Sequence, residues 1–207
     1  ALLPDRDPRR IALLNLQAEA NMALSNYTEA KDLSQSARQL AQECNQQLGL
    51  AISLCNLGHI ARLQEHFSQA EDLLQRSFAI YQTVGDQAGL ARTLNQLGVL
   101  ASYQGDYKKA RDYLQQSLKI HQTSGDQRDA TRTLRDLGMV AFIQEEYALG
   151  QRYLEQCIEL YQMMGDQFGL SSTLNNLGVM AHYQQDYKRA EHYYCLLYTS
   201  DAADEYS

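Results

Sequence analysis

The sequence of 207 residues lacks tryptophan, and its two prolines, Pro4 and Pro8, both stand near the start. Everything after Pro8 is therefore free of the residue that most strongly breaks a helix. Long apolar runs are missing too, since no stretch reaches the roughly 18 residues that a membrane-spanning helix needs. No basic segment followed by an apolar one is present to suggest a secretory signal. We therefore expect a cytoplasmic protein that does not bind membranes.

Strongly basic stretches and metal-binding motifs are also missing. The net charge is -7 and the pI is about 5.2, which argues against a nucleic-acid-binding protein, because such domains usually carry a basic stripe. Cys44, Cys55, Cys157 and Cys195 show no CxxC spacing, and the five histidines show no zinc-ligand interval. Phosphate-binding loops and nucleophile motifs are absent as well. We therefore expect no metal, no cofactor and no catalysis.

What the sequence does contain is a pattern that recurs every 40 residues. Gly-Asp-Gln begins at Gly85, Gly125 and Gly165. The same period relates the pairs Leu57-Gly58, Leu97-Gly98, Leu137-Gly138 and Leu177-Gly178, the aromatic residues Phe67, Tyr107, Tyr147 and Tyr187, and the small residues Ala70, Ala110, Gly150 and Ala190. A weaker first copy has Leu14, Ala18, Tyr27 and Ala30 at these offsets. Such self-similarity is typical of repeat proteins.

Each unit of the pattern predicts two helices joined by a turn. In the third unit Leu94, Leu97 and Ala101 share one helical face, and a second apolar stripe follows the interruption at Gly105-Asp106. Glycine can take the left-handed conformation that ends one helix, and aspartate can accept hydrogen bonds from the first amides of the next. We predict first helices near 11–24, 50–64, 88–104, 128–144 and 168–184, and second helices near 27–45, 67–84, 107–124 and 147–164.

The Leu-Gly, aromatic and small-residue positions at these offsets resemble the signature of the tetratricopeptide repeat (TPR). The 40-residue form is similar to the repeats of kinesin light chains, Pins-type polarity adaptors and bacterial signalling regulators. The resemblance covers residues 11–194 and implies an all-α, right-handed superhelical solenoid of about five antiparallel helix-turn-helix repeats. The predicted units lie near 11–48, 51–88, 91–128, 131–168 and 171–194, the last one truncated, after an N-terminal lead-in at 1–10. One departure is leucine at positions 54, 94, 134 and 174, where the family has a bulky aromatic residue.

The C-terminal segment 195–207 departs from the repeat. From Cys195 to Glu205 it resembles the translation of a transposase adapter that is used to prepare sequencing libraries. We therefore interpret this tail as adapter-derived and expect it to contribute nothing to function. We also expect the chain to be a fragment of a larger protein whose native sequence differs after about Tyr194.

In proteins with this repeat, the inner face of the first helices lines a concave groove. The residues predicted to bind a peptide there are Asn56, Arg62, Arg92, Asn95, Tyr103, Arg132, Arg135, Asn175, Asn176 and Tyr183. Arginine suits carboxylates, and asparagine can pair with both the amide and the carbonyl of an extended peptide. We expect Arg92, Arg132 and Arg135 to act together on one acidic segment.

The function predicted from these features is that of a protein- or peptide-binding scaffold or sensor segment in a larger cytoplasmic signalling or regulatory protein. An alternative is an intramolecular regulatory segment that packs against a neighbouring ATPase or DNA-binding domain. A third reading, an enzyme related to phosphatase-like regulators, is disfavoured because no acid/base constellation is present.

Overall fold

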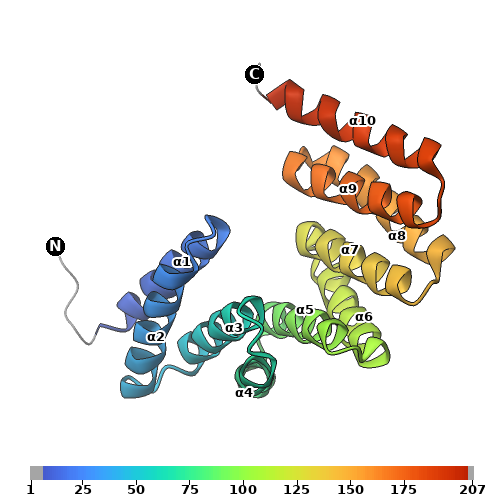
Figure 1. The fold of residues 1–207 in the computed structure, drawn as a ribbon. Coiled ribbons are helices and arrows are strands. Elements are labelled where there is room, and N and C mark those ends of the chain that lie inside the picture. The colour runs from blue at the N-terminus through green and yellow to red at the C-terminus, as the bar shows by residue number, and fades with distance from the viewer. Residues whose placement is uncertain (1–6, 205–207) are drawn as a thin grey trace. The chain divides into compact units, whose positions relative to one another are not determined.

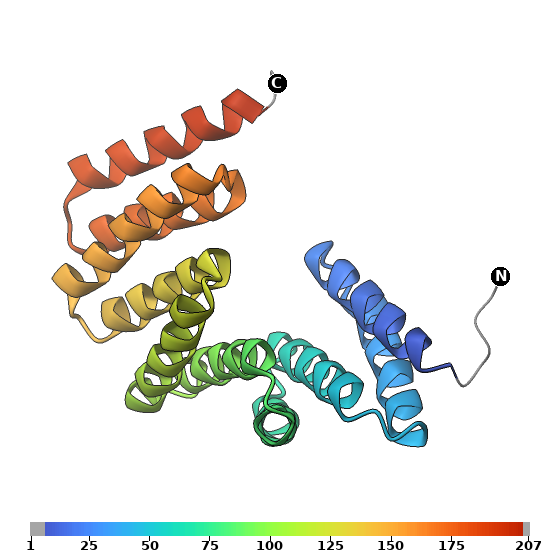
Figure 2. The same ribbon diagram turned by 180° about the vertical axis from the view of Figure 1, so that it is seen from behind.

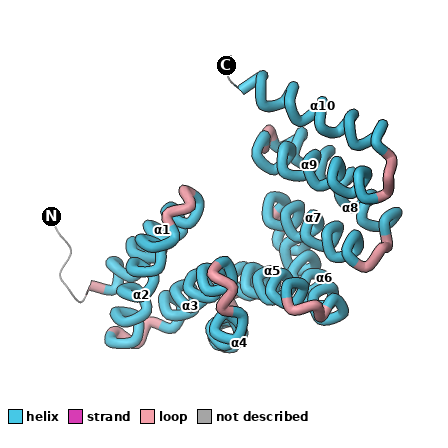
Figure 3. The backbone as a smooth tube through the Cα atoms, in the orientation of Figure 1, coloured by secondary structure: helices cyan, strands magenta, loops and turns pink. Residues whose placement is uncertain are grey.

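The computed structural model describes residues 7–204, and this part of the chain is all-α, with ten helices joined by short turns (Figures 1 and 3). The helices are α1 (Pro8–Ala23), α2 (Tyr27–Glu43), α3 (Gln47–Leu63), α4 (Phe67–Val84), α5 (Gln87–Tyr103), α6 (Tyr107–Ser124), α7 (Gln127–Ile143), α8 (Tyr147–Met164), α9 (Gln167–Tyr183) and α10 (Tyr187–Asp204). The predicted helices and the arrangement of about five helix-turn-helix repeats are confirmed. The first helices begin one to three residues earlier than predicted, because none of the added residues buries an apolar side chain; Leu48 at the start of α3, for example, is exposed. No helix of this part is long and apolar enough to cross a membrane.

The chain divides into two compact units, Ala1–Gly105 and Asp106–Ser207. Unit 1 holds α1 to α5, and unit 2 holds α6 to α10. Within each unit consecutive helices pack against one another, and the first helices of adjacent hairpins also touch, α1 on α3, α3 on α5 and α7 on α9. Figure 2 shows from behind how α10, in red, lies along α9 at the end of unit 2.

The repeated Gly-Asp pair forms the turn between hairpins, as the sequence predicts. Gly85, Gly125 and Gly165 end their helices in the left-handed conformation, with φ of 80°, 75° and 65°. The aspartate that follows each glycine caps the next helix. For example, Asp166 accepts a hydrogen bond of 2.9 Å from the backbone nitrogen of Gly169. The turns therefore satisfy amide groups that a helix start would otherwise leave unpaired.

Small residues let the two helices of a hairpin approach closely. A Cβ at Gly58 on α3 would lie 2.7 Å from Cγ of Leu74 on α4, and Leu74 is fully buried. In unit 2 the same position is Gly138, and a Cβ there would lie 3.0 Å from Cγ of Leu154. A larger side chain at either glycine would force the leucine or the helix to move. The Leu-Gly pairs of the sequence are therefore packing positions.

A hydrogen bond buried inside the hairpin recurs in both units. Ser77 on α4 donates its hydroxyl to the carbonyl of Ala51 on α3 at 2.8 Å. Cys157, which stands at the same repeat position on α8, donates its thiol to the carbonyl of Thr131 on α7 at 3.4 Å. Both side chains have no exposed surface. A buried donor in this position finds its acceptor on the neighbouring helix, as buried polar groups require.

The last helix continues into the tail that we interpret as adapter-derived. α10 extends to Asp204, and Leu197 packs at the edge of a core cluster that includes Leu174 and Tyr161. Leu197 stands at a core-facing position, and its apolar side chain allows the helix to continue there. The origin of segment 195–207 stays a prediction. Residues 1–6 of the lead-in and residues 205–207 of the tail lie outside the described residues.

Candidate functional site

Unit 2 brings four of the predicted binding residues together on two touching helices. Arg132 and Arg135 lie on α7, three residues apart and therefore on one face of that helix. Asn175 and Asn176 lie on α9, which packs against α7. We call the surface formed by Arg132, Arg135, Asp136, Ser172, Asn175 and Asn176 the α7–α9 face.

Arg135 is the most constrained cation of the α7–α9 face. Its Nη1 donates to Oγ of Ser172 on α9 at 3.3 Å, and its Nη2 lies 3.7 Å from Oδ1 of Asp136. The Arg135 side chain is only 19% exposed. Because Ser172 precedes Asn175 by one helical turn, this bond joins Arg135 to the part of α9 that carries the two asparagines. Ser172 is not among the binding residues predicted from the sequence, although it stands 40 residues after Arg132 and so at the same repeat position.

Arg132 is more open than Arg135. Its side chain is 47% exposed, and its Nη1 lies 3.7 Å from Oδ1 of Asp129 one turn earlier. An exposed pair at that distance is worth less than about 1 kcal/mol, so an incoming carboxylate can compete for this guanidinium. Asn175 is exposed and Asn176 is half-buried. The α7–α9 face therefore offers donors for an anion beside amides that suit a peptide backbone.

An aromatic cluster lies at the end of α7 and α9 in unit 2. The ring of Phe142 lies 5.6 Å from that of Tyr183 in an edge arrangement and 5.7 Å from that of Tyr147. Tyr183 keeps 72% of its surface exposed. The predicted residue Tyr183 therefore contacts Phe142 on one side of its ring and leaves most of its aromatic surface exposed.

Unit 1 arranges its predicted residues differently. Asn56 on α3 and Asn95 on α5 are buried, with exposed fractions of 4% and 5%. Arg62 lies over the ring of Tyr103, 5.6 Å from its centroid, and Phe67 stacks on the same ring at 6.1 Å. Tyr103 is 64% exposed and therefore resembles Tyr183 in its setting. A peptide would meet the tyrosine and the arginine of this unit more readily than its asparagines.

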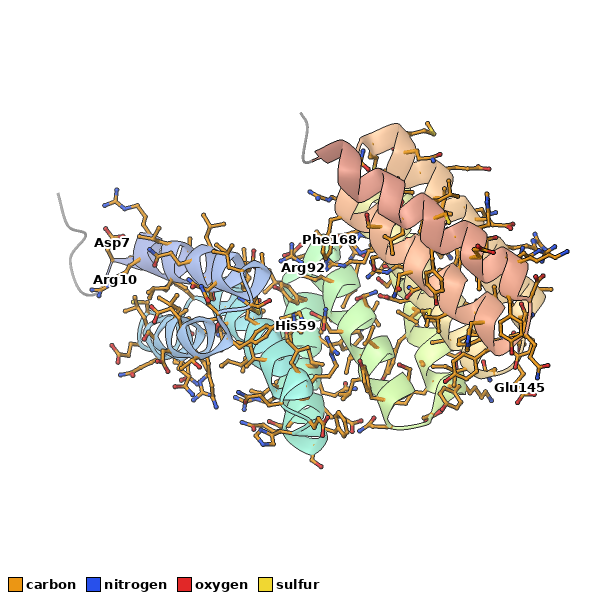
Figure 4. All side chains as sticks on the ribbon, turned by 45° about the horizontal axis from the view of Figure 1, so that its top comes forward. Asp7, Arg10, His59, Arg92, Glu145 and Phe168 are labelled. Carbon is orange, nitrogen blue, oxygen red and sulfur yellow. The ribbon has the colours of Figure 1, made fainter. Side chains whose placement is uncertain are left out.

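Arg92 of unit 1 already has an acidic partner. Its Nη1 lies 3.1 Å from Oε1 of Glu19 on α1, a residue 73 positions away in the sequence. α1 and α5 both pack against α3, so this pair links the two helices that flank it. Figure 4 shows Arg92 on α5 and His59 on α3. The joint action of Arg92 with Arg132 and Arg135 stays a prediction, since Arg92 belongs to unit 1 and the other two arginines belong to unit 2.

Unit 1 also contains a small cavity between α2, α3 and α4. Its volume of about 40 Å³ has room for a few water molecules, far below the roughly 300 Å³ at which ligand pockets begin. It is lined by Lys31, Gln35, Arg38, Leu57, Ile60, Ala61, Gln64, Gln69 and Leu73. Among the described residues, a cluster of possible metal ligands lies elsewhere, at the junction of α6 and α7, and consists of His121, Asp126 and Asp129.

Comparison with solved structures shows the same fold in proteins of low sequence identity. BtubC (BKLC) from P. vanneervenii is 20% identical, with a TM-score of 0.76, 95% of this chain and 83% of that chain covered. A structure of Podosopora anserina putative kinesin light chain TPR-like repeats is 13% identical, with a TM-score of 0.70 and 97% and 98% covered. The Rap conjugation gene regulator of plasmid pLS20, solved with the Phr* peptide, is 15% identical, with a TM-score of 0.77 and 91% and 52% covered.

Comparison of the sequence itself identifies the repeat. A search of curated protein sequences finds no match. The family model of the tetratricopeptide repeat matches residues 9–83, 79–123 and 129–200, which is most of the chain. Together with the helical hairpins and their recurring Leu-Gly packing positions, this match shows that the chain belongs to the tetratricopeptide-repeat family.

Proposed function

We propose that this chain is a non-catalytic module that binds an extended peptide or a protein segment, and that the α7–α9 face holds an acidic part of that partner. The observation that carries the proposal is the bond from Arg135 to Ser172, which precedes Asn175 and Asn176 by about one turn of α9. Arginine forms paired hydrogen bonds with carboxylates, and the asparagines can bind the backbone that carries them.

The position of Arg135 is fixed before a ligand binds, and this preorganisation favours binding. A half-buried arginine whose position is already fixed loses little side-chain entropy when it binds an anion. Arg132 adds a second, more mobile cation on the same face, and Tyr183 adds an exposed aromatic surface. The Rap regulator of plasmid pLS20 was solved with a peptide bound and shares this fold, which supports a peptide as ligand. We further propose that the chain serves in a cytoplasmic signalling or regulatory protein.

The test is a selection of peptides from a random display library on the chain of 207 residues, followed by affinity measurements with fluorescence polarisation. We expect the selected peptides to carry Asp, Glu or a free C-terminal carboxylate. The double variant R132E/R135E should bind them about 10- to 100-fold more weakly, which corresponds to about 1–3 kcal/mol for partly desolvated charged pairs.

The matched control is K119E/R152E, which makes the same change in net charge at exposed positions of α6 and α8. This control should change affinity by less than about threefold, because distant surface charges are screened by salt. Equal losses in both variants would show that only net charge matters, and unchanged affinity in R132E/R135E would remove the α7–α9 face as the site. Thermal melting of each variant separates lost binding from lost folding.

A further inference from the structure

The turn between α6 and α7 differs from its two sister turns, which join α4 to α5 and α8 to α9. The difference lies at two positions, one on each helix, that face each other. Tyr81 packs its ring where a Cβ on Gly89 would be, and Tyr161 does the same against Gly169. At the corresponding positions in the turn between them, 40 residues from each, the sequence has histidine and aspartate, His121 and Asp129. The glycine is needed where the bulky ring is present. Both members of the pair therefore differ from those of the sister turns, and both can bind a metal.

The histidine of this pair is deeply buried. His121 is 2% exposed, and its Nδ1 lies 3.6 Å from Oδ2 of Asp126. One ligand atom each from His121, Asp126 and Asp129 lies within 4.8 Å of the others. An imidazole and two carboxylates thus converge at one point within unit 2.

The backbone of the turn holds these groups in place. The carbonyl of His121 accepts a bond of 3.0 Å from the backbone nitrogen of Asp126 and another of 3.0 Å from Oγ of Ser124. Asp126 uses its Oδ1 to cap α7, accepting from the nitrogen of Asp129 at 3.1 Å. Its Oδ2 is the oxygen that faces the imidazole. Hydrogen bonds of this kind around a ligand fix its orientation and improve a metal site.

We propose that His121, Asp126 and Asp129 form a binding site for a divalent transition-metal ion, with Zn²⁺ the best match. Imidazole nitrogen and carboxylate oxygen are both zinc ligands at about 2.0–2.2 Å, so two ligands of a tetrahedral ion stand about 3.4 Å apart. The pair His121 and Asp126 is already close to that separation, at 3.6 Å. The ligand atom of Asp129 lies within 4.8 Å of the other two and has to approach by at most about 1.4 Å, which a side-chain rotation supplies.

The charge around the cluster favours a cation but limits its affinity. Two carboxylates face the imidazole, while Nη1 of Arg132 lies 3.7 Å from Oδ1 of Asp129. The site therefore has two carboxylates and one arginine, which a metal displaces from Asp129. A bound ion would join the end of α6 to the start of α7. The metal would use ligand atoms different from those of the proposed peptide site, although Arg132 of the α7–α9 face contacts Asp129.

The test is a metal titration of the untagged chain of 207 residues. Binding of Zn²⁺ is measured by calorimetry, and binding of Co²⁺ is measured by the visible absorption of the ion. We expect one equivalent of metal to bind and to raise the melting temperature, since a ligand of the folded state stabilises it. The variant H121Y/D129G restores the residue pair of the sister turns and should therefore fold normally. It should bind Zn²⁺ at least tenfold more weakly.

A second variant guards against misfolding of the first. D129N keeps the size of the side chain and removes one negative charge, so it should also weaken Zn²⁺ binding at least tenfold without loss of helical circular dichroism. The exposed thiol of Cys195 is removed by C195S in every protein compared, because it can bind zinc by itself. The proposal is overturned if this background chain binds no Zn²⁺ at millimolar concentration, or if D129N binds it as tightly.

Discussion

The close approach of α7 and α8 predicts that alanine is harmful at a position where other repeats of this chain have it. A Cβ at Gly150 would lie 2.9 Å from the carbonyl oxygen of Gly138, 3.1 Å from Cε of Met180 and 3.3 Å from the backbone nitrogen of Phe142. Two of these three neighbours are backbone atoms, which cannot rotate away. The variant Gly150→Ala therefore has to push the two helices apart.

Two opposing effects set the magnitude. Overpacking a tight core costs about 1–3 kcal/mol, whereas replacing glycine by alanine inside a helix returns about 1 kcal/mol. We expect Gly150→Ala to lower the free energy of unfolding by about 1 kcal/mol, measured by urea titration with far-ultraviolet circular dichroism. The slope with urea should stay unchanged.

The matched variant is Ala70→Gly at the same repeat position on α4, where the alanine is fully buried. It loses helix propensity and a buried methyl group, so it should also destabilise the fold, by about 1–2 kcal/mol. The two substitutions are the reverse of each other, yet both should lower the free energy of unfolding. A Gly150→Ala protein as stable as the unaltered chain, or more stable, would refute the close backbone contact between α7 and α8.

Three further predictions concern turns and buried groups. Asp166→Ala should lower the free energy of unfolding by about 1 kcal/mol in urea titrations, because it removes the cap of α9 and the pair with Arg128 at 3.2 Å; an unchanged midpoint would contradict this. Glu145→Gly should raise the melting temperature by a few degrees, since Glu145 has a φ of 62° at the turn before α8 (Figure 4), and a lower melting temperature would count against it. Burial raises the pKa of the Cys157 thiol from 9.0 to about 12, so the stability it contributes is complete below about pH 9 and is lost as pH rises toward 12. Urea titrations of the unaltered chain and of C157A between pH 8 and 11 should show a steeper loss in the unaltered chain, and parallel curves would contradict the assignment.

The fold was predictable because its signals are local and repeated. Gly85, Gly125 and Gly165 mark the turns, and the 40-residue period fixes which positions are equivalent. The sequence predicts the start of α3 three residues after its observed start at Gln47, because Leu48 is exposed and does not belong to the core-facing apolar stripe. Helix ends of this kind depend on capping and on neighbouring hairpins, which the sequence pattern reflects only weakly.

The candidate site was predictable only in part. The register places Arg132 and Arg135 on one face of α7, and the structure adds that Ser172 holds Arg135. The burial of Asn56 and Asn95 depends on how closely neighbouring helices pack, and the residue pattern does not predict that distance. The cluster around His121 carries no metal-binding motif, since its ligands occur at positions 121, 126 and 129 and become neighbours only when the turn closes.

The ion pair of Arg92 with Glu19 makes part of the stability of unit 1 sensitive to salt and to ligands that compete for Arg92. Repeat proteins are usually stabilised by contacts between adjacent repeats alone, but this pair joins the first hairpin to a helix of the third. At 44% and 35% side-chain exposure it is worth less than about 1 kcal/mol and weakens as ionic strength rises. If Arg92 binds an acidic ligand, as we propose for this class of surface, that ligand has to displace a carboxylate tethered to the same chain. Displacing Glu19 would also remove the ion pair that connects α1 to α5.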